Sequence, residues 1–170
     1  MDLTATRSQD VVIYIEDLYE GDLKLDDATQ IDAIPWANWL QTWMQSLSRE
    51  TSIDRDCEIS LRFCSDSQIQ AFNFQYRSLD KPTDVLAFAA MESEIVIPIE
   101  VEEPLYLGDI VISLDTASRQ AQEQNHSLVT ELAWLSSHGL LHLLGWDHPD
   151  DLSLKQMLER QSQLIQLLKI

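Results

Sequence analysis

Three of the chain's four histidines lie in the stretch HGLLHLLGWDH, residues 138–148. His138 and His142 are four residues apart, so on a helix both imidazoles project from one face, about one turn apart. The residues before them are apolar at the helical period and contain no helix breaker, which predicts that helix. Imidazoles at this spacing can bind a metal, and they can also simply pack in a core or face water.

The turn after this predicted helix brings a third histidine into reach. Gly145 provides a helix stop, because glycine enters the left-handed conformation at little cost. His148 stands directly before Pro149, which biases His148 toward an extended form. Three neutral imidazoles that converge and leave a fourth position open are the ligand set of a catalytic zinc. We therefore expect His138, His142 and His148 to hold one Zn²⁺ ion, with a water as its fourth ligand.

The histidine spacing also matches the HExxHxxGxxH pattern of the metzincin peptidases. Those enzymes carry a glutamate general base directly after the first histidine, whereas this chain has Gly139 there. A metal site without the peptidase base favours a metal-dependent hydrolase of another class, and a metallopeptidase is the alternative.

The composition indicates a soluble globular chain with an excess of acid. A length of 170 residues suits a single domain, 1–170, and the hydrophobic residues (45%) form no run long enough to span a membrane. The net charge of −18, from 29 acidic and 11 basic side chains, argues against binding nucleic acid through overall charge. A function on nucleic acid must then rest on a local basic patch or on a partner that supplies affinity.

The N-terminus and the cysteines indicate a cytoplasmic protein. MDLTATRSQD has no basic stretch followed by an apolar core, so no secretory signal is visible. Cys57 and Cys64 are seven residues apart in a predicted strand, so they point to opposite faces and cannot pair without distortion. We expect two reduced structural thiols, neither of them a metal ligand.

Hydrophobic periodicity predicts one small sheet packed against helices. Strands are expected at 11–17, 57–64, 85–90 and 108–113. Helices are expected from Pro35 to Leu47, at 65–77, at 114–125, through the histidine motif, and at 150–170. The segment 20–33 is expected to be a solvated connection, and 91–106 a hairpin or a loop over the site.

The predicted helices have apolar faces and caps that can be checked. The Trp36, Trp39 and Trp43 stripe favours core packing over a nucleobase-stacking platform. Ser65 or Asp66 is expected to cap the second helix, and Asp115 the third. The inward residues are expected to be Ile69, Phe72 and Tyr76 on the second helix, and Leu154, Met157, Leu158, Leu164, Ile165 and Leu168 on the last.

Four motifs resemble, in the same order, those of the YbeY family of bacterial rRNA maturation factors. HGLLHLLGWDH resembles the family signature HGxLHLxGYDH, with Trp146 in place of its tyrosine. PTDVLAF resembles PTDVLSF, with Ala87 in place of its serine, and LGDIVIS resembles the LGDI strand. The segment from Asn73 to Arg77 resembles LNxxYR, and Glu131 stands where the family has a glutamate.

The resemblance implies an α+β fold: a small mixed β-sheet of about four strands packed with about five helices, with the metal site on a helix and its following turn. It implies a zinc-dependent endoribonuclease specific for single-stranded RNA, acting in small-subunit rRNA 3′ end maturation and ribosome quality control. The expected partners are single-stranded RNA or rRNA and the ribosomal small subunit or its assembly factors. An assembly factor whose metal is mainly structural is a second alternative.

Three further residues are candidates for the site. The resemblance places Arg77 in the cleft beside the metal, where its guanidinium would bind phosphate oxygens through paired donors; a surface cation at a helix end is the alternative. Asp147 would orient a ligand imidazole or cap the turn. Glu131, two helical turns before His138, would reach the site or be solvated.

Three other polar residues have less defined roles. Asp84 and Asp109 lie in strand-like segments, which indicates either a cleft or a hydrogen bond in a turn. We expect His126, just before the histidine helix, to be an exposed loop residue rather than a ligand.

Overall fold

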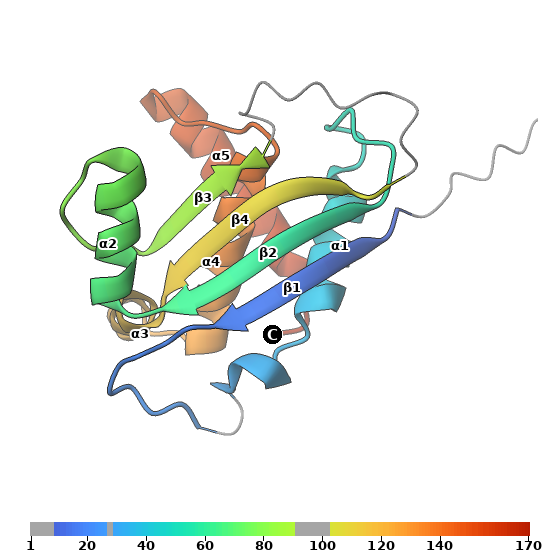
Figure 1. Cartoon of the computed structure of the whole chain (residues 1–170). Coiled ribbons are helices and arrows are strands. Elements are labelled where there is room, and N and C mark those ends of the chain that lie inside the picture. The colour runs from blue at the N-terminus through green and yellow to red at the C-terminus, as the bar shows by residue number, and fades with distance from the viewer. Residues whose placement is uncertain (1–8, 27–28, 91–102) are drawn as a thin grey trace, which may run out of the picture.

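The computed structural model describes residues 9–26, 29–90 and 103–170 (Figure 1). Within them a four-stranded sheet has the order β1-β2-β4-β3, in which β2 pairs in parallel with β1 and β4, and β3 runs antiparallel to β4. The mixed sheet confirms the predicted α+β fold. The strands are β1 (Val11–Asp17), β2 (Cys57–Cys64), β3 (Val85–Ala89) and β4 (Leu105–Ser113).

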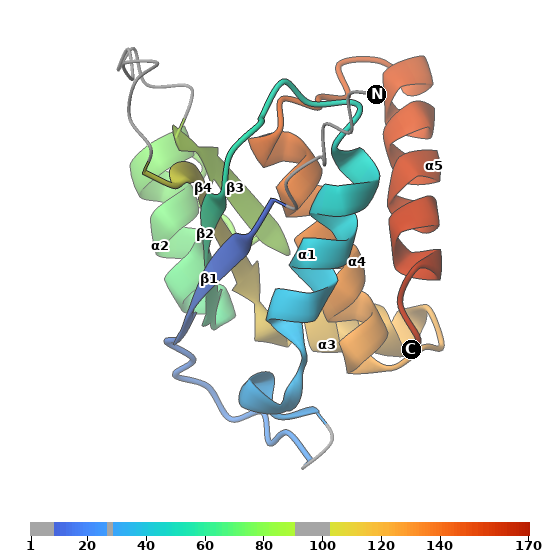
Figure 2. The ribbon, with the colours of Figure 1, turned by 90° about the vertical axis from the view of Figure 1, so that its right-hand side faces the viewer.

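The helices lie on both faces of this sheet (Figure 2). Helix α2 covers part of one face, α1 and α4 cover the other, and α5 packs on the outer side of α4. No helix of the described segments is long and apolar enough to cross a membrane. The helices are α1 (Trp36–Leu47), α2 (Asp66–Arg77), α3 (Leu114–Glu123), α4 (Leu128–Leu143), α5 (Asp151–Gln166) and the short 3₁₀ helix η2 (Ile31–Ala33).

Alternation along β2 separates two cores, because successive side chains point to opposite faces. Cys57, Ile59 and Leu61 belong to the large core under α1 and α4, and Cys64 belongs to a small core under α2. Both cysteines are free and buried, as predicted. Burial raises the pKa of Cys57 to about 11 and that of Cys64 to about 12, so both stay protonated thiols.

The tryptophan stripe of α1 is in the core, as expected. Trp36, Trp39 and Trp43 are at most 2% exposed, and Trp43 donates from Nε1 to the carbonyl of Leu164 on α5. The prediction of a solvated connection over 20–33 is wrong at its end. Ile31, in η2, is buried, and its carbonyl accepts a hydrogen bond from Trp36 Nε1. This residue therefore closes the large core at the start of α1.

Two predicted inward residues are exposed. Tyr76 is 59% exposed, and the buried residue on that part of α2 is Asn73, whose amide donates to the Lys81 carbonyl. Leu158 is 39% exposed, whereas Met157 and Leu164 are fully buried. Each helix contacts its neighbour through a narrower strip than its apolar residues cover.

Other predicted boundaries differ at single residues. Ser65 caps α2 within a capping box, as expected, but the cap of α3 is Ser113 and not Asp115. Asp115 instead accepts hydrogen bonds from the Tyr19 hydroxyl and the Asp66 amide. Strand β4 starts at Leu105, so the predicted hairpin or loop over 91–106 ends before that residue. Residues 91–102 of that predicted segment lie outside the described residues.

Two glycines allow β4 to lie close to its neighbours. Gly108 has φ +137° at a register irregularity of β4, and a Cβ there would come within 2.1 Å of the Phe88 carbonyl oxygen. A Cβ on Gly139 would meet the Ile110 side chain at 2.7 Å. Helix α4 therefore packs directly on β4, and this fixes where the histidines of α4 emerge beside edge strand β3.

Candidate metal centre

Helix α4 carries the first two histidines. Ser127 caps it by accepting a hydrogen bond from the Thr130 amide, and the helix continues unbroken to Leu143. One face of α4 is buried in the large core through Leu132, Leu140 and other apolar residues. His138 and His142 are only partly buried, because they line a cleft beside that core.

The turn after α4 has the hydrogen bonds of a Schellman motif. The Trp146 amide donates to the Leu141 carbonyl and the Gly145 amide donates to the His142 carbonyl, both at 3.0 Å. Gly145 has φ +95°, the conformation for which glycine was predicted here. The chain is thereby reversed, and His148 returns to the two histidines of the helix.

The three imidazoles form one group. His138 Nε2 and His142 Nε2 are 3.0 Å apart, and the potential ligand atoms of all three residues lie within 4.8 Å of one another. The centroid of the His148 ring lies 5.8 Å from that of the His138 ring and 5.4 Å from that of the His142 ring. The structure thus brings together the three residues that the spacing predicted as ligands.

This group fits a tetrahedral metal ion. Zinc–nitrogen bonds of about 2.0–2.1 Å place tetrahedral ligand atoms roughly 3.4 Å apart, which the nitrogens reach with small side-chain shifts. Burial lowers the pKa of His142, and the neighbouring His138 and His148 lower it further. A hydrogen bond with the Trp146 backbone raises this pKa, but by less. The neutral imidazole that metal binding requires is therefore favoured.

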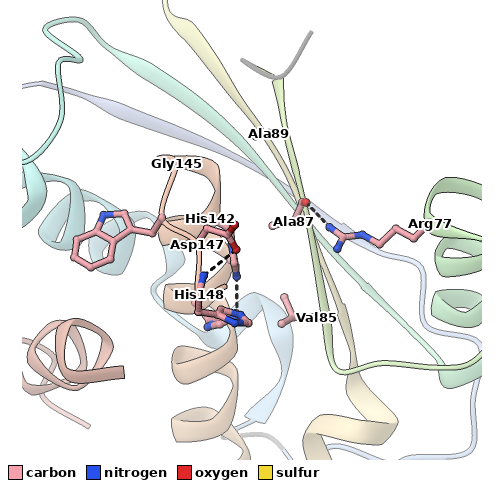
Figure 3. Close-up of a pocket in the computed structure, with 11 residues that line it drawn as sticks. Arg77, Val85, Ala87, Ala89, His142, Gly145, Asp147 and His148 are labelled. Carbon is pink, nitrogen blue, oxygen red and sulfur yellow. Dashed lines mark hydrogen bonds between the residues drawn. The ribbon is translucent and has the colours of Figure 1, made fainter. Parts of the chain in front are cut away.

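The histidines line a cleft of about 510 Å³ whose opposite wall is β3. Val85, Ala87 and Ala89 contribute small side chains to that wall, and Arg77 reaches it from the end of α2 (Figure 3). Arg77 Nη2 donates to the Ala87 carbonyl at 3.1 Å, and the guanidinium carbon lies 5.8 Å from the centre of the Phe88 ring. Arg77 is thus both the last residue of α2 and part of the cleft.

Asp147 lies on the same turn and also lines the cleft. Its Oδ1 accepts a hydrogen bond from the His148 backbone amide at 2.8 Å. This contact matches the turn-capping alternative, and it holds the backbone of a candidate ligand rather than its imidazole.

Glu131 is placed away from the cleft. Its side chain is 5% exposed, so the solvated alternative is wrong, and its Oε2 lies 2.5 Å from His126 Nε2. Both residues line a second hollow, together with Asp84, whose carboxylate accepts from the Gln120 amide and the Val85 backbone amide. His126 is in a loop, as expected, but it pairs with a buried acid.

The remaining strand carboxylate, Asp109, faces the α2 side of the sheet. It accepts a hydrogen bond from the Tyr106 hydroxyl at 2.5 Å and lies 3.9 Å from Arg62. These contacts, rather than a cleft, explain an acid inside β4.

One residue at the centre was not predicted. Gln161, on α5, is fully buried, and its Oε1 lies 3.0 Å from His138 Nδ1. The available signal was a glutamine on the otherwise apolar inward face of the last helix, between Met157 and Leu164. Sequence spacing cannot relate that position to His138, because the two helices meet only in the tertiary structure.

The position that follows the first histidine has no room for a peptidase-type base. Gly139 lies against Ile110, and its missing side chain would point into β4. A glutamate there would have to displace the Ile110 side chain. The packing thus agrees with the sequence argument against a metzincin-like peptidase.

Known proteins resemble this chain over most of its length. The family profile described as Endoribonuclease YbeY matches residues 23–169. A protein named Endoribonuclease YbeY from Picosynechococcus sp. is 55% identical over 77% of this chain and 80% of its own length, and one from Trichormus variabilis is 54% identical over 81% and 78%. The solution structure of TM1509 from Thermotoga maritima aligns with a TM-score of 0.54 at 26% identity, covering 92% of this chain and 88% of that one.

The match covers most of the chain and includes the histidine turn, Arg77 and the β3 wall. The chain belongs to the YbeY family of endoribonucleases.

Proposed function

We propose that the chain is a zinc-dependent endoribonuclease that hydrolyses single-stranded RNA in the cleft between α4 and β3. The observation that carries the proposal is the convergence of His138, His142 and His148 on a cleft that Arg77 also lines. Three nitrogen ligands with an open side are typical of catalytic rather than structural zinc.

The residues of the cleft divide the chemistry between them. When bound, zinc lowers the pKa of a coordinated water toward neutrality and so supplies a nucleophile. The histidines would hold the ion on the α4 side. Arg77 would bind the phosphodiester on the β3 side and stabilise the charge that develops on its oxygens. A guanidinium has five N–H donors, so donation to the Ala87 carbonyl leaves others for phosphate.

Aromatic side chains beside Arg77 support a single-stranded substrate. The exposed Tyr76 ring lies 5.2 Å from the Phe88 ring, over which the Arg77 guanidinium lies. Unpaired bases stack on such rings, whereas the bases of a duplex are already stacked on each other. An RNA whose phosphate contacts Arg77 could therefore place a neighbouring base on Tyr76.

The charge of the chain supports a partner in RNA binding. Arg77 is the one lysine or arginine among the described residues of the cleft, in a chain of net charge −18. Long-range repulsion of a polyanion would then oppose binding of free RNA. We infer that the substrate is rRNA presented by the ribosomal small subunit or its assembly factors, in the cytoplasm, where the buried thiols stay reduced.

Cleavage of a labelled single-stranded RNA tests the proposal. Wild type loaded with one equivalent of zinc should cut the RNA, and a chelator or His142→Ala should abolish cutting. His126→Gln is the matched control, because His126 lies outside the cleft and glutamine keeps a hydrogen-bond donor for Glu131. It should cut like wild type and remain sensitive to the chelator.

The other outcomes separate the remaining functions. Equal cutting by wild type and His142→Ala would reveal a contaminating nuclease and contradict the proposal for this centre. No cutting, even with small-subunit particles present, together with a large loss of thermal stability on chelation, would favour an assembly factor with a structural metal. Cutting of unfolded protein that His142→Ala abolishes would restore the metallopeptidase alternative.

A further inference from the structure

Gln161 is a buried polar residue that the proposed mechanism does not use. It is fully buried on α5, in a helix face that otherwise presents Met157 and Leu164 to the core. Burying an amide costs free energy unless its polar atoms are hydrogen-bonded. The partners of this amide therefore indicate why a glutamine stands there.

Both ends of the amide contact α4, and one contact determines its orientation. The carbonyl of Trp134, 3.1 Å from the amide nitrogen of Gln161, can only accept a hydrogen bond, so the NH₂ group must face it. The amide oxygen then faces His138 Nδ1 at 3.0 Å. Since that oxygen can only accept, the hydrogen bond requires a proton on Nδ1 of His138.

This tautomer leaves Nε2 of His138 with a free electron pair. Nε2 is also the nitrogen that lies 3.0 Å from His142 Nε2, within the three-histidine group. The opposite tautomer would set the Nδ1 electron pair against the amide oxygen and put a proton where a metal must bind. Hydrogen bonds of this kind orient ligand imidazoles and increase their basicity in metal sites.

We propose that Gln161 is a positioning residue of the metal centre, which fixes the tautomer and ring orientation of His138 for zinc. The inference rests on the proposed zinc site. Helix α5 starts, capped by Asp150, just after the turn that carries His148. Helix α5, which follows His148 in the chain, thus packs along α4 and places Gln161 against Nδ1 of His138.

Zinc affinity, measured by competition with a chromophoric chelator on metal-free protein, tests the inference independently of cleavage. Gln161→Met keeps the length of the side chain but removes both hydrogen bonds, and it should weaken zinc binding about 10- to 100-fold. Gln161→Glu keeps an acceptor for Nδ1–H but has no donor for the Trp134 carbonyl. Because the acceptor is the atom that acts on His138, the zinc affinity of this variant should stay within about threefold of wild type. Gln156→Met, on the exposed side of α5, is the matched control and should bind like wild type.

The tautomer is read directly from the imidazole nitrogen chemical shifts of His138 in metal-free wild type. We expect a protonated Nδ1 and an unprotonated Nε2. This measurement decides the question even if Gln161→Met fails to fold, because it needs no variant at residue 161.

The outcomes distinguish this inference from the proposed function. Failure of wild type to bind zinc, or equal binding by His142→Ala, would overturn the zinc site itself. Wild-type binding that is matched by folded Gln161→Met, or a proton on Nε2 of His138, would overturn the role of Gln161 and leave the zinc site intact.

Discussion

Two groups of polar side chains beside the sheet have different surroundings. One is Asp66 with the side chains that donate hydrogen bonds to it, here called the acid cluster, and the other is the three-histidine group. Asp66 accepts hydrogen bonds from the hydroxyls of Ser113 and Thr116, both at 2.6 Å, and from Arg119 at 2.8 Å. Burial raises the pKa of the Asp66 carboxyl, but these hydrogen bonds outweigh burial and leave the pKa below its ordinary value. The carboxylate of Asp66 thus finds its hydrogen-bond donors within the protein.

In the histidine group, the protein holds the rings through Gln161 and the Trp146 backbone, and the Nε2 atoms of His138 and His142 contact each other. Gln161 accepts from the far side of His138, while the potential ligand nitrogens face one another and an open cleft. Burial of His142 disfavours its protonated form. Polar groups that are held in place with their ligand atoms converging on an open cleft are suited to an outside ligand. The direction in which the polar atoms point, more than residue type, thus separates a binding site from a structural cluster.

The largest effect on cleavage should come from removing an exposed member of the open group. His148→Ala should reduce cleavage more than about 100-fold, because loss of a ligand exceeds the roughly 10- to 100-fold cost of losing an outer partner. The thermal midpoint of the metal-free protein should change by less than about 2 °C, since His148 is exposed. Cleavage assays and thermal melts of both proteins measure this. A large loss of metal-free stability would make the group structural, like the acid cluster.

Arg77 should come next, because it contributes to the same cleft without touching the metal. Arg77→Ala should reduce cleavage about 100-fold and Arg77→Lys about 10-fold, since lysine keeps the charge but not the paired donors. Zinc affinity should equal that of wild type. Parallel cleavage and chelator-competition measurements check this, and an equal fall in both would mean that Arg77 acts by holding β3 in place.

Tyr76 should have a smaller effect that is confined to substrate binding. Tyr76→Ala should raise the KM for single-stranded RNA about 5- to 20-fold, the lower part of the range for one stacked base. Tyr76→Phe keeps the ring and should restore binding. Phe74→Ala is the matched control, because Phe74 is equally exposed on the same helix, 59% in both cases. Steady-state kinetics would contradict base stacking if both alanine variants weakened binding alike.

The acid cluster should affect cleavage least and stability most. Asp66→Asn should change cleavage less than about twofold while lowering the free energy of unfolding by about 1–3 kcal/mol, because it weakens hydrogen bonds to a charged acceptor. The pKa of Asp66 is lowered by folding, so its contribution is present above the ordinary value of 3.8 and lost as pH falls through the folded pKa. Denaturant titrations should show the difference between wild type and Asp66→Asn shrinking in acid. A difference that is constant with pH would contradict this role for the charge.

Much of the fold followed from local pattern. The order of strands and helices, the mixed α+β architecture, the Trp36 stripe and the Ser65 cap were predicted, because periodicity and capping act over a few residues. The errors lie where a neighbour far along the chain determines burial. Tyr76 and Leu158 belong to apolar helix faces that are wider than the surfaces packed against them. Asp115 bonds to Tyr19 instead of capping α3.

The sequence by itself determined the three-histidine group, because a helix with a four-residue spacing and a glycine turn brings His138, His142 and His148 together within eleven residues. Only the tertiary structure decided what surrounds that group. Arg77 reaches the cleft because α2 ends against edge strand β3, Gln161 reaches His138 because α5 packs along α4, and Glu131 is directed to His126 instead of the cleft. Such contacts depend on the packing of whole elements, and residue spacing carries no measure of the distance between elements that are far apart in the chain.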